Sequence, residues 1–307
     1  MDKPRILVIG AGVNGSAVAS NLFTGGVNVT VLARGKRYDE LSTEGIVIEN
    51  PFNQKRTVTH VPVINALAPD DVYDYILVIV RKNQALELLP LLAQNQSPNI
   101  VFMGNNLLGP GEFIRVLGIE RVMMGSVYAG GKRDGSLIRA MVIKSVNSPF
   151  GEIDGTITPR LMRLAEILHQ GRLKVELSRN IVDTQMTHAV GVALIGMLLM
   201  KHAGKVRRMG AATDDLKLYV AARREGHRMM LALGHEIIPK TEYLLSFVPS
   251  FLQVLATRIL LYSKLGEVGL EYHVSQAPDE MIQLAAELRI MVDQAGMPVP
   301  AVRKVLG

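Results

Sequence analysis

The chain of 307 residues contains no cysteine and no tryptophan. Without cysteine it can form no disulfide, and it offers no thiolate for nucleophilic catalysis, an iron–sulfur cluster or most zinc sites. This absence is typical of proteins from reducing compartments, so we expect a cytoplasmic location. His60, His169, His227, His235 and His273 show no metal-ligand spacing, so we expect no metal site and interpret them as surface or structural residues.

Long apolar runs are also missing. The longest, residues 189–200, is shorter than the ~20 residues of a membrane-spanning helix and is typical of a buried helix. The apolar residues near the N-terminus lead directly into a glycine-rich turn, which favours a strand over a signal peptide. The formal net charge is +6, but the basic residues are scattered along the chain. We therefore expect a small-molecule substrate and neither nucleic acid nor membrane as partner.

Hydrophobic residues make up 48% of the chain, and its length predicts two domains. The first half alternates short β-rich runs with amphipathic stretches, which indicates a Rossmann-type, doubly wound parallel sheet. An antiparallel ribbon is expected within residues 46–63, and turns are expected at Gly130-Gly131 and Asp134-Gly135. The predicted strands are residues 5–9, 27–33, 75–80, 99–103 and 121–125, and the predicted helices are 16–23, 84–93 and 111–117.

The second half has mostly helical periodicity. After a strand-like segment at residues 173–177, its apolar residues recur at helical spacing. We therefore predict an α/β protein with a Rossmann-like NADP-binding domain at residues 1–155 and a mostly α-helical substrate domain at 156–307. Its apolar helices are compatible with a homodimer and equally with burial inside one subunit. The helices predicted here span residues 158–169, 180–203, 213–233, 249–263 and 278–295.

A glycine-rich motif follows the first predicted strand and opens the first predicted helix, as the G-x-G-x-x-G fingerprint of dinucleotide-binding folds requires. The first glycine permits a tight turn, the second leaves room for pyrophosphate, and the third allows close helix–strand packing. The helix N-terminus attracts negative charge. The predicted cofactor-binding residues of this motif are Gly10, Ala11, Gly12, Val13, Asn14 and Gly15.

Arg34 stands at the end of the second predicted strand, where an enzyme specific for NAD usually has an acidic residue. Lys36 and Arg37 follow in what we predict to be the same loop. A guanidinium is a good bidentate partner for a phosphate, so Arg34 favours NADP(H) through its 2′-phosphate. A solvated basic loop remains the alternative.

Several segments resemble the ketopantoate reductase (2-dehydropantoate 2-reductase) family over most of the chain. Residues 32–35 resemble the family's basic residue and glycine after the second strand. Residues 78–84 resemble a strand end that carries a cofactor-contacting lysine, here Arg81, and Phe150–Gly155 resembles the domain junction. In Gly104–Leu108, the family's asparagine beside the nicotinamide falls on Asn105, and Asn106 stands where glycine is usual. The resemblance implies that Arg81 and Asn105 contact NADP(H).

In this family a reduced nicotinamide passes hydride to a 2-oxo acid, and a helical lysine acts as general acid. The resemblance places His188 at the lysine position and Val192 and Gly196 at two substrate-holding asparagines. These positions share one helix face, and we expect a less polar, roomier wall there and a substrate other than ketopantoate. With its ordinary pKa near 6.5, His188 could supply an imidazolium near neutrality. Alternatively, it caps the polar end of an apolar helix face.

Two more substrate contacts follow from the resemblance. Ser250 falls in a Ser-Met-Leu-Gln-like segment, although Ser250 and Gln253 also have the spacing of a capping box. If residues 262–277 are an insertion, the family's substrate-binding glutamate falls on Glu280. An acidic residue just after Pro278 is also favourable for the helix dipole without any further role.

We therefore expect an NADPH-dependent oxidoreductase that reduces a 2-oxo acid or related carbonyl to the hydroxy product. His188 would donate the proton, Asn105 would orient nicotinamide or substrate, and Glu280 would act with them. One alternative is an NADP(H)-binding redox-sensing or regulatory protein without turnover. Another is an imine reductase of the opine type.

Overall fold

The computed structural model describes residues 3–127, 129–142 and 147–307. The chain divides into two compact units, Met1–Gly104 with Pro110–Val182, and Asn105–Gly109 with Asp183–Gly307. This division lies later than the sequence-based boundary between residues 155 and 156. The reason is that β12 (Val175–Leu177) pairs with β11 (Ser148–Glu152), and α5 (Pro159–Gln170) packs against both strands.

The first unit is built on a sheet that, in the described residues, has eight strands in the order β12-β11-β8-β7-β6-β1-β2-β5. Strands β8, β7, β6, β1, β2 and β5 run parallel, and β11 is antiparallel to β8. The order reverses between β1 and β6, and such a switch point is where doubly wound sheets bind ligands. The parallel strands are β1 (Arg5–Ile9), β2 (Asn28–Leu32), β5 (Val63–Ile64), β6 (Tyr75–Val78), β7 (Ile100–Phe102) and β8 (Val122–Gly125).

Helices cover both faces of this sheet. Ile6 and Val8 of β1 pack with α1 (Val13–Thr24) and α5, whereas Leu7 and Ile9 pack with α3 (Lys82–Gln94) and α4 (Gly111–Leu117). The alternation follows from the strand period of two. It confirms the predicted doubly wound arrangement.

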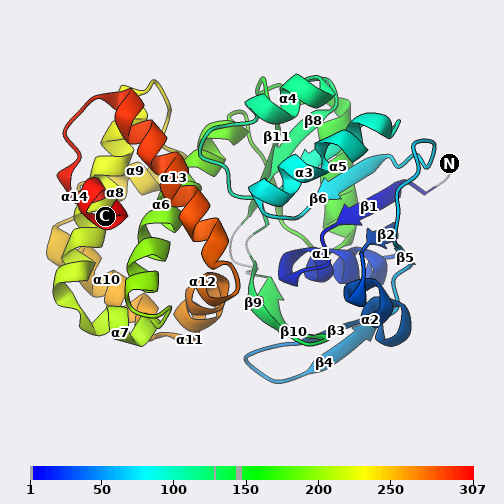
Figure 1. Cartoon of the computed structure of the whole chain (residues 1–307), viewed down its shortest axis with the longest axis horizontal. Coiled ribbons are helices and arrows are strands. Elements are labelled where there is room, and N and C mark those ends of the chain that lie inside the picture. Colours follow the sequence, from blue (N-terminus) through cyan, green and yellow to red (C-terminus); the bar gives the residue numbers. More distant parts are fainter. Residues whose placement is uncertain (1–2, 128, 143–146) are drawn as a thin grey trace. The chain divides into compact units, whose positions relative to one another are not determined.

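A second sheet has the order β4-β3-β10-β9 among the described residues, and α1 lies between the two sheets (Figure 1). Its strands are β3 (Ile46–Glu49), β4 (Arg56–Thr59), β9 (Ala129–Asp134) and β10 (Leu137–Val142). The predicted ribbon is confirmed as the antiparallel pair β3–β4, and the turn at Asp134-Gly135 joins β9 to β10. The predicted turn at Gly130-Gly131 is wrong, because both residues lie within β9. A Cβ at Gly131 would come within 2.4 Å of the Arg139 carbonyl oxygen, so this glycine permits close strand pairing.

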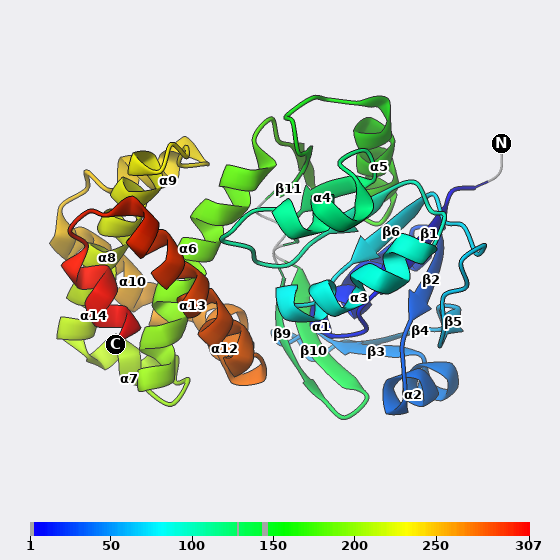
Figure 2. The same ribbon diagram turned by 45° about the horizontal axis from the view of Figure 1, so that its top comes forward.

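The second unit is helical, and Figure 2 shows α12 beside the start of α13, apart from α10. The long helix α6 meets the length and composition of a membrane span, but most of its apolar stretch is buried inside the structure, as in a core helix. The helices of the second unit are α6 (Ile181–Lys201), α7 (Val206–Ala211), α8 (Thr213–Ala232), α9 (Lys240–Leu245), α10 (Ser250–Tyr262), α11 (Lys264–Gly266), the π-helix η1 (Glu267–Glu271), α12 (Tyr272–Gln276), α13 (Pro278–Ala295) and α14 (Pro300–Leu306).

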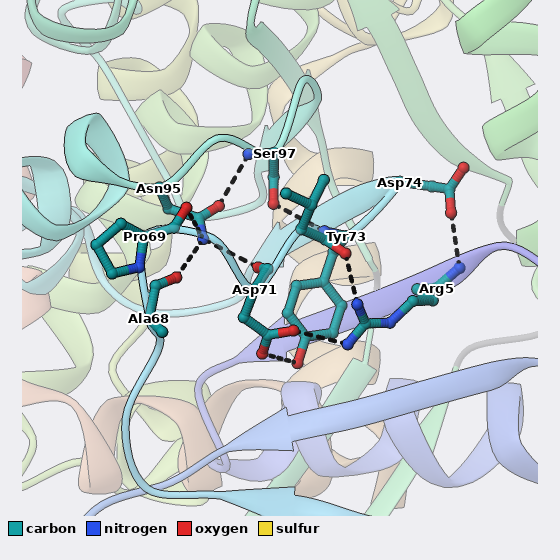
Figure 3. Close-up of polar contacts among 9 residues, drawn as sticks. Arg5, Ala68, Pro69, Asp71, Tyr73, Asp74, Asn95 and Ser97 are labelled. Carbon is teal, nitrogen blue, oxygen red and sulfur yellow. Dashed lines mark hydrogen bonds and ion pairs between the residues drawn. The ribbon is translucent and has the colours of Figure 1, made fainter.

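A polar network joins the amino ends of β1 and β6 to the end of α3 (Figure 3). Arg5 pairs with Asp71 at 2.7 Å, and the Tyr73 hydroxyl donates to the other Asp71 oxygen at 2.8 Å. Asn95, which is 2% exposed, donates from Nδ2 to the carbonyl oxygens of Ala68 at 2.8 Å and Asp71 at 3.0 Å. Asn95 therefore fixes the segment that leads into β6.

We expect Asn95→Ala to lower the free energy of unfolding by about 2 kcal/mol, because it removes the hydrogen bonds of the buried Asn95 amide and takes away the acceptor, at 3.0 Å, of the buried Ser97 N–H. Dinucleotide affinity should not change, since this network lies at the strand ends opposite the glycine-rich turn. Urea denaturation and a cofactor titration measure the two effects. Asn53→Ala in an exposed turn is the control, and a loss for Asn95→Ala no larger than that of the control would contradict this role.

Candidate functional site

The glycine-rich turn follows β1 and leads into α1. Gly10 has a φ of +111°, and a Cβ there would lie 2.3 Å from the carbonyl oxygen of Ile79. A Cβ at Gly15 would lie 1.7 Å from the carbonyl oxygen of Gly10. Both positions therefore require glycine, because the backbones of β1, α1 and the segment after β6 meet there.

Gly12 differs from these two glycines, since a Cβ there would meet nothing within 4 Å. Gly12 is the N-cap of α1, and neither a side-chain cap nor an acidic residue serves the first turn of this helix. Open space thus faces helix N–H groups that can bind an anion. Ala11, Val13 and Asn14 complete this partly accessible turn, and the arrangement fits a dinucleotide pyrophosphate.

Arg34 is exposed at the end of β2, on the same edge of the sheet as Gly10. The predicted loop is wrong for Lys36 and Arg37, which begin helix α2 (Lys36–Glu44). The Arg37 guanidinium donates to the Ala11 carbonyl at 3.0 Å and pairs with Glu40 at 3.0 Å. Arg37 therefore supports the glycine-rich turn, whereas Arg34 is accessible to a phosphate.

Arg81 lies beyond β6, next to the switch point of the sheet. It is the N-cap residue of α3, and its backbone N–H donates to Gln84 Oε1 at 3.4 Å. A Cβ at Gly104, beyond β7, would lie 2.7 Å from the Val80 carbonyl oxygen. The segments after β6 and β7 therefore meet closely where ligands bind in this fold.

In the second unit, Glu280 connects the candidate residue Asn105 with a histidine, His273. Asn105 Nδ2 donates to Glu280 Oε1 at 2.8 Å, and His273 Nε2 lies 2.9 Å from Glu280 Oε2. The Glu280 side chain is 12% exposed, and that of His273 is 35% exposed. The carboxylate is therefore enclosed, and the ring it holds remains accessible.

The loop that carries Asn105 is fixed to α13 at a second point. The Leu107 N–H donates to Glu287 Oε2 at 3.0 Å, and Glu287 lies seven residues after Glu280 on the same helix face. Asn106 is buried, donates to the Gly109 carbonyl at 2.7 Å and accepts from the Leu108 N–H at 3.1 Å. Asparagine at position 106 thus stabilises the loop that presents Asn105.

His188 interacts electrostatically with this cluster. Although solvent reaches its side chain, desolvation by the surrounding protein lowers the pKa of His188 to about 4. Positive charge on His273 lowers this pKa further, and the Glu280 carboxylate opposes the shift. His188 is therefore neutral at pH 7, whereas a histidine with the ordinary pKa near 6.5 would still be partly protonated there.

Val192 and Gly196 follow His188 along α6. Val192 is half-buried, whereas Gly196 is buried, and a Cβ at Gly196 would lie 2.2 Å from Met281 Sδ. The expected roomier wall at Gly196 is thus occupied by Met281. This glycine allows α13 to approach α6 and helps place the neighbouring Glu280.

Ser250 is exposed at the first position of α10, and its Oγ accepts from Arg224 Nη1 at 2.8 Å. The predicted capping box is wrong, because Pro249 is the N-cap and Gln253 donates to the carbonyls of Leu245 and Val248. The structure thus brings together Asn105, Glu280 and His188 in one cluster, and Ser250 belongs to a different hydrogen-bonded group.

Sequence reasoning missed His273, interpreted above as a surface or structural residue. It lies in α12, within the segment treated as an insertion, and a break at Ala277 separates it from α13. The sequence does contain one signal, because His273 and Glu280 are seven residues apart and lie on either side of Pro278. A proline at such a place marks the start of a new helix.

Residues 6–147 match a family model described as Ketopantoate reductase PanE/ApbA. The fold is similar to 2-dehydropantoate 2-reductase from Geobacter metallireducens GS-15, with a TM-score of 0.79 and 17% identity over 98% of this chain and 97% of that chain. A PanE/ApbA family ketopantoate reductase from Ralstonia eutropha JMP134 gives 0.77 and 15% over 98% and 96%. D-mandelate dehydrogenase in a ternary structure with NADH and anilino(oxo)acetate gives 0.80 and 12% over 98% and 96%. No curated protein matches the chain in sequence.

Proposed function

We propose that this chain, whose residues 6–147 match the ketopantoate reductase family model, is an NADPH-dependent oxidoreductase that reduces a 2-oxo acid or related carbonyl to the hydroxy product. The observation that carries the proposal is the glycine-rich turn, where Gly10 and Gly15 are required by the backbone and Gly12 opens onto the start of α1. The family and the dehydrogenases of similar fold support NAD(P)H-dependent oxidoreduction in general.

In this proposal, the residues from Gly10 to Gly15 bind the pyrophosphate, Arg34 binds the 2′-phosphate, and Arg81 contacts cofactor phosphate. When bound, NADPH supplies the hydride. Arg34 is exposed, whereas Arg37 donates a hydrogen bond to Ala11 and pairs with Glu40. These observations support Arg34 as the residue that selects the phosphorylated cofactor.

At the substrate end, Asn105 orients the reacting groups, and Glu280 holds Asn105. Val192 provides a less polar wall, and the neutral His188 ring can donate a hydrogen bond to a carbonyl oxygen. Ser250 remains a candidate for a more distant part of the substrate. The D-mandelate dehydrogenase structure with bound anilino(oxo)acetate supports including aromatic 2-oxo acids among the candidates.

Oxidation of NADPH with a panel of 2-oxo acids tests this function. The panel contains ketopantoate, 2-oxoisovalerate and phenylglyoxylate, each with and without an added amine. We expect turnover without amine, and a lower kcat/KM for ketopantoate than for another member, because Val192 and Gly196 replace polar residues. Turnover only with an amine would favour an imine reductase of the opine type.

We expect Arg34→Ala to reduce the preference for NADPH over NADH by about 30-fold, since it removes a charge-assisted contact worth about 2 kcal/mol. Its NADH affinity should stay within about twofold of the unmodified chain. Lys36→Ala is the matched control, because the Lys36 side chain is 87% exposed in the same region. Fluorescence titration measures all affinities, and equal losses for both cofactors would exclude Arg34 as the 2′-phosphate contact.

A second candidate function is an NADP(H)-dependent redox sensor without reductase turnover. The neutral state of His188 favours it, because the position where the family has a lysine then carries no positive charge at pH 7. Tight NADPH binding without oxidation by any panel member would support the sensor.

A further inference from the structure

We infer that His273, held by Glu280, donates the proton to the substrate oxygen during reduction, and that His188 assists as a neutral hydrogen-bond donor. This inference rests on the proposed function and deepens it. It assigns the acid to a helix outside the region that carries the family's lysine.

The geometry of Glu280 supports this assignment. One carboxylate oxygen accepts from Asn105 at 2.8 Å, and the other lies 2.9 Å from His273 Nε2. An enclosed carboxylate beside one ring nitrogen fixes the orientation of a histidine, because it accepts a hydrogen bond from that nitrogen. Within the described parts of the chain, His273 Nδ1 makes no hydrogen bond and is available to a ligand.

Among the described residues, the charged groups of the neighbouring η1 have lysine partners, and Glu280 and His188 are the titratable groups with a recorded interaction with this ring. In η1, which precedes α12, Glu271 binds Lys205 at 2.9 Å, and Glu267 binds Lys264 at 3.0 Å. Glu280 faces His273 from α13, and His188 of α6 is coupled to it electrostatically. A single π-helical turn is often found next to functional residues.

The proposed proton transfer balances with the hydride transfer. Hydride from the reduced dinucleotide adds to the carbonyl carbon, and the π-electron pair of the C=O bond moves onto oxygen. The Nδ1–H bond of protonated His273 breaks, its proton passes to that oxygen, and the electron pair stays on the ring. The neutral ring then takes a proton from solvent. Because His188 is neutral at pH 7, it is a poorer proton source.

The first test compares matched histidine variants with NADPH and phenylglyoxylate or 2-oxoisovalerate as probes. We expect His273→Gln to lower kcat about 100-fold with KM nearly unchanged, and His188→Gln to lower kcat less than about 10-fold. Added imidazole should restore part of the activity of His273→Ala. The control is His235→Gln, because His235 pairs with Asp183 at 2.7 Å and is 33% exposed, close to the 35% of His273. This control should retain full kcat.

A second readout needs no turnover. In the cofactor-free chain, oxamate, a 2-oxo acid analogue, should shift the ring NMR signals of His273 but not those of His235. Unchanged His273 signals at saturating oxamate would overturn the inference, as would full kcat in His273→Gln. Either result leaves the proposed function intact if the unmodified chain turns over. No turnover with any panel member would overturn the proposed function and this inference together.

Discussion

Replacing Gly12 by aspartate is expected to weaken NADPH binding by about 100-fold without lowering the free energy of unfolding. The position has room for a side chain, because a Cβ meets nothing within 4 Å. Aspartate is a favourable N-cap, so it should stabilise α1 in the cofactor-free chain. The same carboxylate would repel the pyrophosphate by about 3 kcal/mol. Stability and affinity should therefore change independently.

Fluorescence titration with NADPH and thermal unfolding of the cofactor-free chain measure these two effects. Gly12→Asn is the matched control, because asparagine has almost the shape of aspartate without its charge. We expect it to lose far less affinity than Gly12→Asp. Similar losses in the two variants would show that the Gly12 position excludes side chains by size and not by charge.

Replacing Gly15 by alanine is expected to lower the free energy of unfolding by about 3 kcal/mol. Its Cβ would lie 1.7 Å from the carbonyl oxygen of Gly10, so the turn and the start of α1 must move apart. The displaced turn should also lose NADPH affinity. In contrast to Gly12→Asp, this variant should therefore lose stability and affinity together.

Urea denaturation provides the measurement, and Gly191→Ala provides the control. Gly191 lies inside α6, and a Cβ there would meet nothing within 4 Å. Alanine at position 191 should raise stability by about 0.5–1 kcal/mol through its higher helix propensity. If Gly15→Ala were as stable as the unmodified chain, the close contact between the Gly10 carbonyl and Gly15 of α1 would be wrong.

Local patterns predicted much of the fold. The run of residues 5–9 is β1, the periodic stretch 111–117 is α4, and the antiparallel ribbon within 46–63 is β3 with β4. These elements have a clear hydrophobic period and clear turn residues, so their sequence and their tertiary surroundings favour the same structure.

Other features depend on contacts that no local pattern contains. Asn105 and Glu280 are 175 residues apart in the sequence, and only the folded second unit brings them together. The lowered pKa of His188 likewise results from desolvation by the folded protein and from the charge of His273, and not from its neighbours in sequence. His273 was missed because the break between α12 and α13 interrupts the helical periodicity, so no local pattern predicts that His273 contacts Glu280.

The central claim is that the glycine-rich turn and Arg34 bind a dinucleotide with a 2′-phosphate. Calorimetric titration of the unmodified chain with NADPH and NADH at the same salt concentration tests it most directly. We predict that NADPH binds at least about 10-fold more tightly than NADH, because one charge-assisted contact to the 2′-phosphate contributes at least this much to the affinity. Equal affinities, or no binding of either dinucleotide, would contradict the claim.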